Sequence, residues 1–120
     1  MKYMIMMFGD QATMMEERSV EWIKEMIEFM GTVNDDLVKS GELVSAEGLA
    51  DPTQAKTVDI ENGIPVATDG PFAEAKESLA GFWIIDVADE ARAIEFTSRI
   101  VAFVERPVEV RQVADAPPEF

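Results

Sequence analysis

The residues best suited to acid–base chemistry in this sequence are two carboxylates, Asp69 and Glu47. Asp69 opens the turn Asp69-Gly70-Pro71-Phe72 between two predicted strands. Its carboxylate either bonds backbone amides of its own turn or faces a pocket as a proton acceptor. Glu47 alternates with Leu43 and Ser45 along one predicted strand face. Beside apolar neighbours it is suited to act as an acid or base, whereas on the solvent side it would have no such role.

Three further residues are candidate ligand contacts. Trp83 either forms the wall of a pocket or packs in the core, and Phe72 either stacks on a ligand or anchors the core. Asp10 follows the first predicted strand, where it either caps a loop or borders a cavity. Lys76 and Glu77 form either an ion pair at the mouth of a pocket or part of a solvated turn. These residue types point to recognition of a small molecule.

Two missing residue types narrow the chemistry further. The chain has no Cys and no His, which excludes thiolate nucleophiles, imidazole bases, a Ser-His-Asp triad and the usual zinc sites. All eight methionines fall within the first thirty positions. Met4, Met6, Met7, Met26 and Met30 suit an adaptable core where the first strand meets its helix. We therefore expect neither a metal nor a cofactor.

The charge balance limits the partners. Lys and Arg number 10 against 24 Asp and Glu, a net charge of −14, so nucleic acids and anionic membranes are unfavourable partners. The chain has no apolar run long enough to cross a membrane. Residues 1–8 weakly resemble a signal peptide, but they lack a small-residue cleavage site and are interpreted as a strand. We expect a cytoplasmic protein.

The hydrophobic pattern predicts one domain, residues 1–120, with two βαβ units and an inserted hairpin. A capping box, Thr13-Met14-Met15-Glu16, predicts the start of the first helix, and Ser40-Gly41 its end. Asn62-Gly63 predicts a tight hairpin turn. In chain order we expect a strand at 3–8, that first helix, a strand at 43–49, hairpin strands at 56–60 and 64–67, a strand at 81–87, a helix between Asp89 and Pro107, a strand at 108–113 and a tail at 114–120.

This order predicts a ferredoxin-like α+β fold, in which both helices cover the same face of an antiparallel sheet. However, Tyr3–Phe8 and Phe82–Ile85 are apolar on both sides. Phe82 and Trp83 must therefore face opposite sides, one toward the helices and one toward another cover. A second copy of the chain, packed sheet against sheet, is the simplest cover, so we expect a homodimer.

The segment from Thr68 to Ile85, which contains Asp69-Gly70-Pro71-Phe72 and the following Ala-Glu-Ala-Lys-Glu, resembles the YCII-related family. It is similar in particular to the branch named for the Asp-Gly-Pro-Phe motif, and the start Met1-Lys2-Tyr3-Met4 agrees. The resemblance implies a ferredoxin-like, dimeric α/β-barrel with a cavity between sheet and helices, and a largely uncharacterised function. Some relatives in the wider family are thought to be enzymes with a His–Asp pair. This chain has no His, so half of that pair has no counterpart.

Three functional hypotheses follow. The first is a small dimeric module that binds an apolar or aromatic molecule through Asp69, Glu47 and Trp83. The second is a cofactor-free enzyme in which Asp69 or Glu47 carries a proton. The third is an accessory protein whose surface meets another protein, and the resemblance associates its branch with sigma-factor regulation. A cavity with a carboxylate beside it favours the first two hypotheses, and a filled core favours the third.

Overall fold

Four antiparallel strands form the central sheet of the chain, whose computed structural model describes residues 1–72 and 77–119. They are β1 (Lys2–Phe8), β2 (Leu43–Gly48), β5 (Leu79–Asp86) and β6 (Glu109–Gln112). Their order across the sheet is β2-β5-β1-β6, with each neighbour antiparallel. The predicted α+β class is confirmed, and this strand order is consistent with a ferredoxin-like fold.

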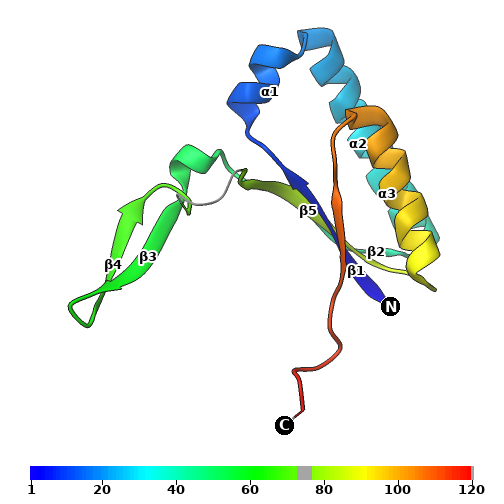
Figure 1. Cartoon of the computed structure of the whole chain (residues 1–120). Coiled ribbons are helices and arrows are strands. Elements are labelled where there is room, and N and C mark those ends of the chain that lie inside the picture. The colour runs from blue at the N-terminus through cyan, green and yellow to red at the C-terminus, as the bar shows by residue number, and fades with distance from the viewer. Residues whose placement is uncertain (73–76, 120) are drawn as a thin grey trace.

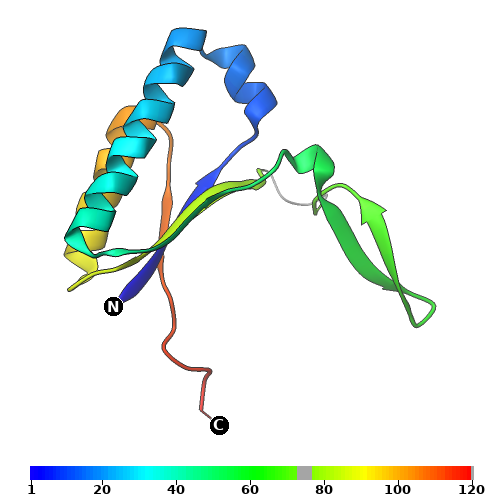
Figure 2. The ribbon, with the colours of Figure 1, turned by 180° about the vertical axis from the view of Figure 1, so that it is seen from behind.

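The helices lie together over one face of this sheet. The two long ones, α2 (Val20–Ser40) and α3 (Glu90–Val104), run side by side, and the short α1 (Gln11–Glu17) precedes α2 (Figures 1 and 2). The predicted end of the first long helix is confirmed at Gly41, whose φ is 77°. The predicted start of the last helix is confirmed at Asp89, whose carboxylate accepts from the Arg92 amide at 2.9 Å. Within residues 1–72 and 77–119, no helix combines the length and the apolar content needed to cross a membrane.

The predicted single helix starting at Thr13 is wrong, because the chain forms two helices there. Asp10 caps α1 by accepting from the Thr13 amide at 2.6 Å, so Thr13 is itself inside the first turn. Arg18 ends α1 in an extended conformation, and Ser19 then caps α2 by accepting from the Trp22 amide at 3.1 Å. The extended backbone at Arg18 and Ser19, together with the Ser19 side-chain acceptor, therefore overrides the periodicity that runs through both helices.

The core fills the space between the sheet and the helices. Trp83 is 6% exposed and packs edge-on against Phe96 of α3, with ring centroids 5.6 Å apart. Side chains directly opposite in antiparallel strands share a face, so Ile5, the partner of Trp83, also faces the helices. The core residues of the described chain are Tyr3, Ile5, Val33, Leu37, Trp83, Ile85, Val87, Ala93, Phe96, Ile100 and Val104.

The other face of the sheet has an apolar centre that no helix of the described residues covers (Figures 1 and 2). Met4 is paired with Ile84, and Met6 with Phe82, and all four side chains are half-buried. We call these four residues the open face. Phe82 and Trp83 thus lie on opposite faces, as predicted. The prediction that Met4 and Met6 pack against the first helix is wrong, because strand alternation turns both away from it.

A bulge at Val44 changes the predicted faces of β2. Leu43 pairs with Ile85, whereas Ser45 pairs with Ile84, so the register shifts by one residue between them. Leu43 consequently faces the helices, while Ser45 and Glu47 lie on the face that carries Phe82. The predicted shared face of Leu43, Ser45 and Glu47 is therefore wrong, because plain alternation does not anticipate the extra residue.

Strands β3 (Lys56–Glu61) and β4 (Ile64–Asp69) form a separate two-stranded sheet that projects from the body (Figures 1 and 2). It follows the short 3-10 helix η1 (Pro52–Gln54). The predicted turn is confirmed, with φ of 51° at Asn62 and 79° at Gly63. The radius of gyration is 16.8 Å, whereas a compact chain of this length has about 14 Å. The hairpin accounts for part of this excess.

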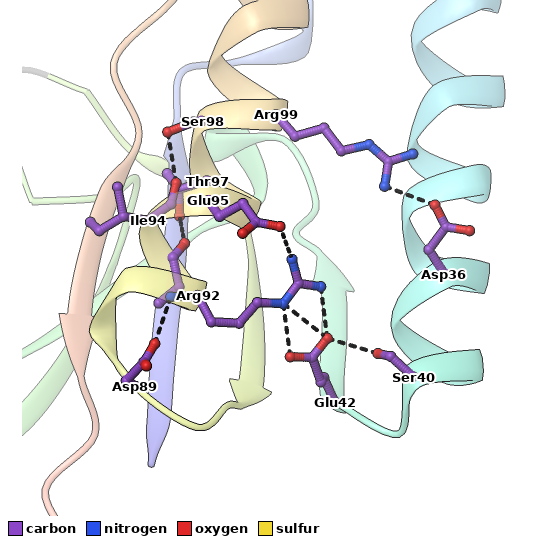
Figure 3. Close-up of polar contacts among 11 residues, drawn as sticks. Asp36, Ser40, Glu42, Asp89, Arg92, Ile94, Glu95, Thr97, Ser98 and Arg99 are labelled. Atoms are coloured by element: carbon purple, nitrogen blue, oxygen red, sulfur yellow. Dashed lines mark hydrogen bonds and ion pairs between the residues drawn. The ribbon is translucent and has the colours of Figure 1, made fainter.

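A polar network joins the C-terminal end of α2 to the N-terminal part of α3 (Figure 3). The Arg92 guanidinium of α3 donates to both carboxylate oxygens of Glu42, at 2.9 Å from Nε and 2.7 Å from a terminal nitrogen. The Ser40 hydroxyl donates to the same carboxylate at 2.8 Å. These bonds tie α3 to the end of α2 just before β2. They hold the pKa of Glu42 below its usual range, chiefly through the Arg92 hydrogen bonds.

Candidate ligand-binding cavity

A cavity of about 340 Å³ lies between the sheet and the two N-terminal helices. Its volume is near the lower end of the range of about 300–1,000 Å³ that is usual for small-molecule sites. The wall is built from β1, α1, α2, β2, β5 and the loops after β1 and β2. The lining residues are Met7, Gly9, Asp10, Met14, Met26, Met30, Asn34, Ala46, Glu47, Gly48, Leu49, Ala50, Asp51, Pro52, Ala80, Gly81, Phe82 and Trp83.

Methionines supply much of the apolar wall. Met7 comes from β1, Met14 from α1, and Met26 and Met30 from one side of α2. Each thioether is flexible and polarisable, so such a wall adapts its shape to a bound molecule and makes favourable contacts with aromatic rings. Together with Trp83 across the cavity, these side chains favour an apolar or aromatic ligand.

Trp83 is held in place by a polar bond. Its indole Nε1 donates to Oδ1 of Asn34 at 2.7 Å, which links β5 to α2 beside the cavity. A buried Trp N–H without an acceptor would lose the hydrogen bond that water provides in the unfolded chain. Asn34 therefore satisfies the indole and fixes the ring plane at the cavity wall.

Small residues leave the space that the ligand would occupy. Ala46 lies directly opposite Trp83, and Gly48 opposite Gly81. A Cβ at Gly81 would stand 2.9 Å from the carbonyl oxygen of Glu47, closer than real Cβ atoms approach a backbone atom. The absence of a side chain at Gly81 thus lets β2 approach β5 at the cavity wall.

Asp10 is the carboxylate at the turn between β1 and α1. It accepts from the Thr13 amide at 2.6 Å, and this bond, aided by Arg106, holds its pKa below the usual range. The group is therefore ionised at neutral pH and is a hydrogen-bond acceptor rather than a proton donor. Within residues 1–72 and 77–119, no three acidic side chains gather closely enough to hold a metal ion.

The structure brings three of the five candidate residues to this cavity: Trp83, Asp10 and Glu47. Trp83 faces inward from β5, and Asp10 lies at the loop after β1. Glu47 lines the cavity from edge strand β2, but its exposed side chain lies on the face opposite Trp83. Its carboxylate is thus turned away from the methionine wall.

Asp69 and Phe72 lie elsewhere, at the base of the hairpin. The Asp69 side chain is 86% exposed and accepts a bond from the Lys56 ammonium. Phe72 is 76% exposed, so the prediction that it anchors the core is wrong, because the chain leaves the hairpin away from the helix layer. Glu77 accepts from Arg106 at 3.0 Å, whereas Lys76 lies outside the described residues.

Sequence reasoning missed Asn34, Met14 and Ala46. Asn34 lies one position after the core residue Val33 in the helical pattern, and a polar residue at such a position is typical of the solvent-facing side of a helix. Ala46 belongs to a strand whose faces the bulge reverses. The available signal is the group of methionines in the first thirty residues, which predicts an adaptable core, whereas four of these methionines line the cavity.

Comparison with known proteins gives two similarities. The YCII-related domain matches residues 1–117. A protein of Rhizobium meliloti strain 1021, itself described as uncharacterized, is 31% identical over 100 residues, which cover 80% of this chain and 77% of that protein. The domain match therefore includes the sheet, the helices and the projecting hairpin.

Proposed function

This chain belongs to the YCII-related family, and we propose from its cavity that it is a binding protein for a small apolar or aromatic molecule. The cavity between β2, β5 and the helices is the single observation that carries this proposal. It has a volume of about 340 Å³, an adaptable methionine wall and a tryptophan whose orientation is fixed. A few fixed polar groups in an apolar cavity are typical of a small-molecule site.

The binding roles differ among the candidate residues. Trp83 provides an aromatic wall, and Asp10 an ionised acceptor at one end. The role of Asn34 is to position Trp83, because it accepts the hydrogen bond from the indole. We retain Asp69 and Phe72 as proposed ligand contacts only for an assembly in which the base of one chain's hairpin lies at the cavity of another chain. Their motif supports membership of the branch named for Asp-Gly-Pro-Phe.

The working unit in this proposal is a cytoplasmic homodimer. The open face presents Met4, Met6, Phe82 and Ile84, flanked by polar residues of the two outer strands. Two such faces packed around a two-fold axis would cover one another and form the dimeric α/β-barrel. The hairpin also exposes Val58 and Ile60, at 66% and 65%. Since an isolated two-stranded sheet is marginally stable, the partner chain is its proposed cover.

The proposal is tested with N-phenyl-1-naphthylamine, an uncharged aromatic probe whose fluorescence rises in apolar surroundings. Ala46→Phe places a ring in the cavity opposite Trp83, so we expect the affinity for this probe to fall at least about tenfold. Ser45→Phe is the matched control, because it puts the same ring on the opposite face of the same strand. Equal probe affinity in wild type and Ala46→Phe, with both proteins folded, would overturn the proposal.

A further inference from the structure

A second, smaller cavity of about 120 Å³ adjoins the first. The two cavities share a common wall, which consists of Met7, Gly9, Asp10, Met14, Met26 and Ala80. The two cavities therefore lie side by side at Asp10, and we refer to them as the larger and the smaller lobe.

The two lobes differ in charge. The described lining of the larger lobe contains carboxylates but no Lys or Arg. The smaller lobe is lined by Arg18 and Arg106, together with Glu17 and Asp10. The described lining of the smaller lobe thus balances two arginines against two carboxylates, whereas that of the larger lobe is acidic, in a chain with 10 basic and 24 acidic residues.

Arg18 is held as a fixed cation. Its guanidinium carbon lies 4.4 Å from the centre of the Trp22 ring, and a terminal nitrogen donates to the Val104 carbonyl at 3.4 Å. Arg18 is in no ion pair with another residue of the described ranges. A guanidinium carries five N–H donors, so donors remain for a ligand anion after the bond to Val104.

Arg106 is the second arginine that lines the smaller lobe. One terminal nitrogen pairs with Glu77 at 3.0 Å, and the other lies 3.5 Å from where a Cβ would stand on Gly9. Gly9 belongs to the wall shared by the lobes, so this second nitrogen reaches the junction. The Asp10 carboxylate there is already engaged by the Thr13 amide. This carboxylate is ionised, and Arg106 lies close enough to lower its pKa, so the Arg106 charge offsets part of the repulsion between Asp10 and an anion.

We propose that the ligand is an amphipathic organic anion whose apolar body lies along the methionine wall and whose carboxylate or sulfonate lies between Arg18 and Arg106. This inference rests on the proposed function and names the substrate class of the same site. A carboxylate suits guanidinium donors because two parallel N–H groups match its two oxygens, and a tetrahedral sulfonate can present two of its three oxygens to the same donors. An uncharged ligand of the same shape would leave these donors unused.

The test compares two probes that differ by one sulfonate. They are 8-anilinonaphthalene-1-sulfonate and its uncharged counterpart, N-phenyl-1-naphthylamine, titrated by fluorescence into the full chain. We expect wild type to bind the sulfonate more tightly. Arg18→Gln and Arg106→Gln should each lower the affinity for the sulfonate about tenfold, which corresponds to the loss of one charge-assisted bond. The affinity for the uncharged probe should stay within twofold of the wild-type value.

Two control variants make the outcome specific. Arg99→Gln removes a cation that pairs with Asp36 between the helices, away from both lobes, and should change neither affinity. Arg18→Lys retains the charge and should recover part of the sulfonate affinity, which separates charge loss from misfolding. Equal sulfonate affinity in wild type and both glutamine variants would overturn the inference and leave the cavity intact as a site. Binding of the uncharged probe without binding of the sulfonate would overturn the inference alone, whereas failure of both probes to bind wild type would overturn the inference and the proposed function together.

Discussion

The indole of Trp83 and the amide of Asn34 form the closest polar link between the sheet and α2 at the cavity, with Nε1 donating to Oδ1 at 2.7 Å. Trp83 also packs edge-on against Phe96 of α3. One residue of β5 is thus held by both long helices. A ring fixed in this way gives the cavity a wall that exists before a ligand arrives, which lowers the cost of ordering on binding.

Asn34→Leu should destabilise the fold because it leaves the indole N–H without its acceptor. The expected loss in free energy of unfolding is about 1–3 kcal/mol, the cost of an unsatisfied buried donor. Urea unfolding followed by circular dichroism measures it. In Trp83→Phe no donor remains, so adding Asn34→Leu to that variant should cost less than it does in wild type. Equal costs in the two backgrounds would show that the bond does not stabilise the fold.

Gly81→Ala should destabilise the sheet, because its Cβ would stand 2.9 Å from the Glu47 carbonyl oxygen and force β2 away from β5. Overpacking of this kind costs about 1–3 kcal/mol. The matched control is Gly48→Ala on the opposing strand, where a Cβ meets nothing within 4 Å and the expected change is within about 0.5 kcal/mol. Equal thermal midpoints for the two variants would contradict the close approach.

Glu42→Gln should alter the pH dependence of stability. Its pKa is lowered in the folded chain, chiefly by the Arg92 hydrogen bonds. The ionised form therefore stabilises the fold above the unfolded pKa, and this contribution is lost as pH falls through the lower folded value. At pH 7 the variant should be less stable by about 1–2 kcal/mol, since the pair is partly solvated. The difference should shrink on acidification below about pH 4.

Chemical unfolding at several pH values checks this expectation, and Glu95→Gln is its control. Glu95 also pairs with Arg92, but its side chain is 74% exposed, so its removal should cost little at any pH. If the difference in free energy of unfolding between wild type and Glu42→Gln stayed constant from pH 7 to pH 3, the lowered pKa of Glu42 would not be its cause.

Met6→Glu should weaken the proposed homodimer, because it places a charge at the centre of the open face beside Phe82. We expect light scattering to show a shift toward monomer at micromolar concentration. Ile94→Glu is the control, since Ile94 is 48% exposed on α3 and lies in the helix layer. A wild-type chain that is monomeric at these concentrations would remove the basis of the dimer proposal.

The strands and long helices were predictable because their signals are local. Asn62-Gly63 set the hairpin turn, and the Asp89 cap and the Gly41 end follow from side-chain and φ preferences within a few residues. The split of the first helix was missed because its apolar periodicity runs on past Ser19. A short polar cap there competes with a long hydrophobic pattern, and the cap prevails.

The site was less predictable because it depends on register and on distant contacts. The bulge at Val44 moves Glu47 to the face opposite Trp83, and no local signal marks it. Asp69, the residue that the turn motif made prominent, lies on a projecting hairpin. Asn34 lines the cavity and accepts from Trp83 of β5, 49 positions away. Such pairings arise when the chain folds and leave little trace in the local sequence.

The most direct test of the proposed binding site uses the methyl resonances of the methionines. Met7, Met14, Met26 and Met30 line the cavity, whereas Met1, Met4, Met6 and Met15 do not. NMR spectra of protein labelled with ¹³C at the methionine methyls, titrated with N-phenyl-1-naphthylamine, report both groups at once. We expect saturable shifts confined to the four cavity methyls. Shifts confined to Met4 and Met6 on the open face, or none at any methionine, would contradict the proposed function.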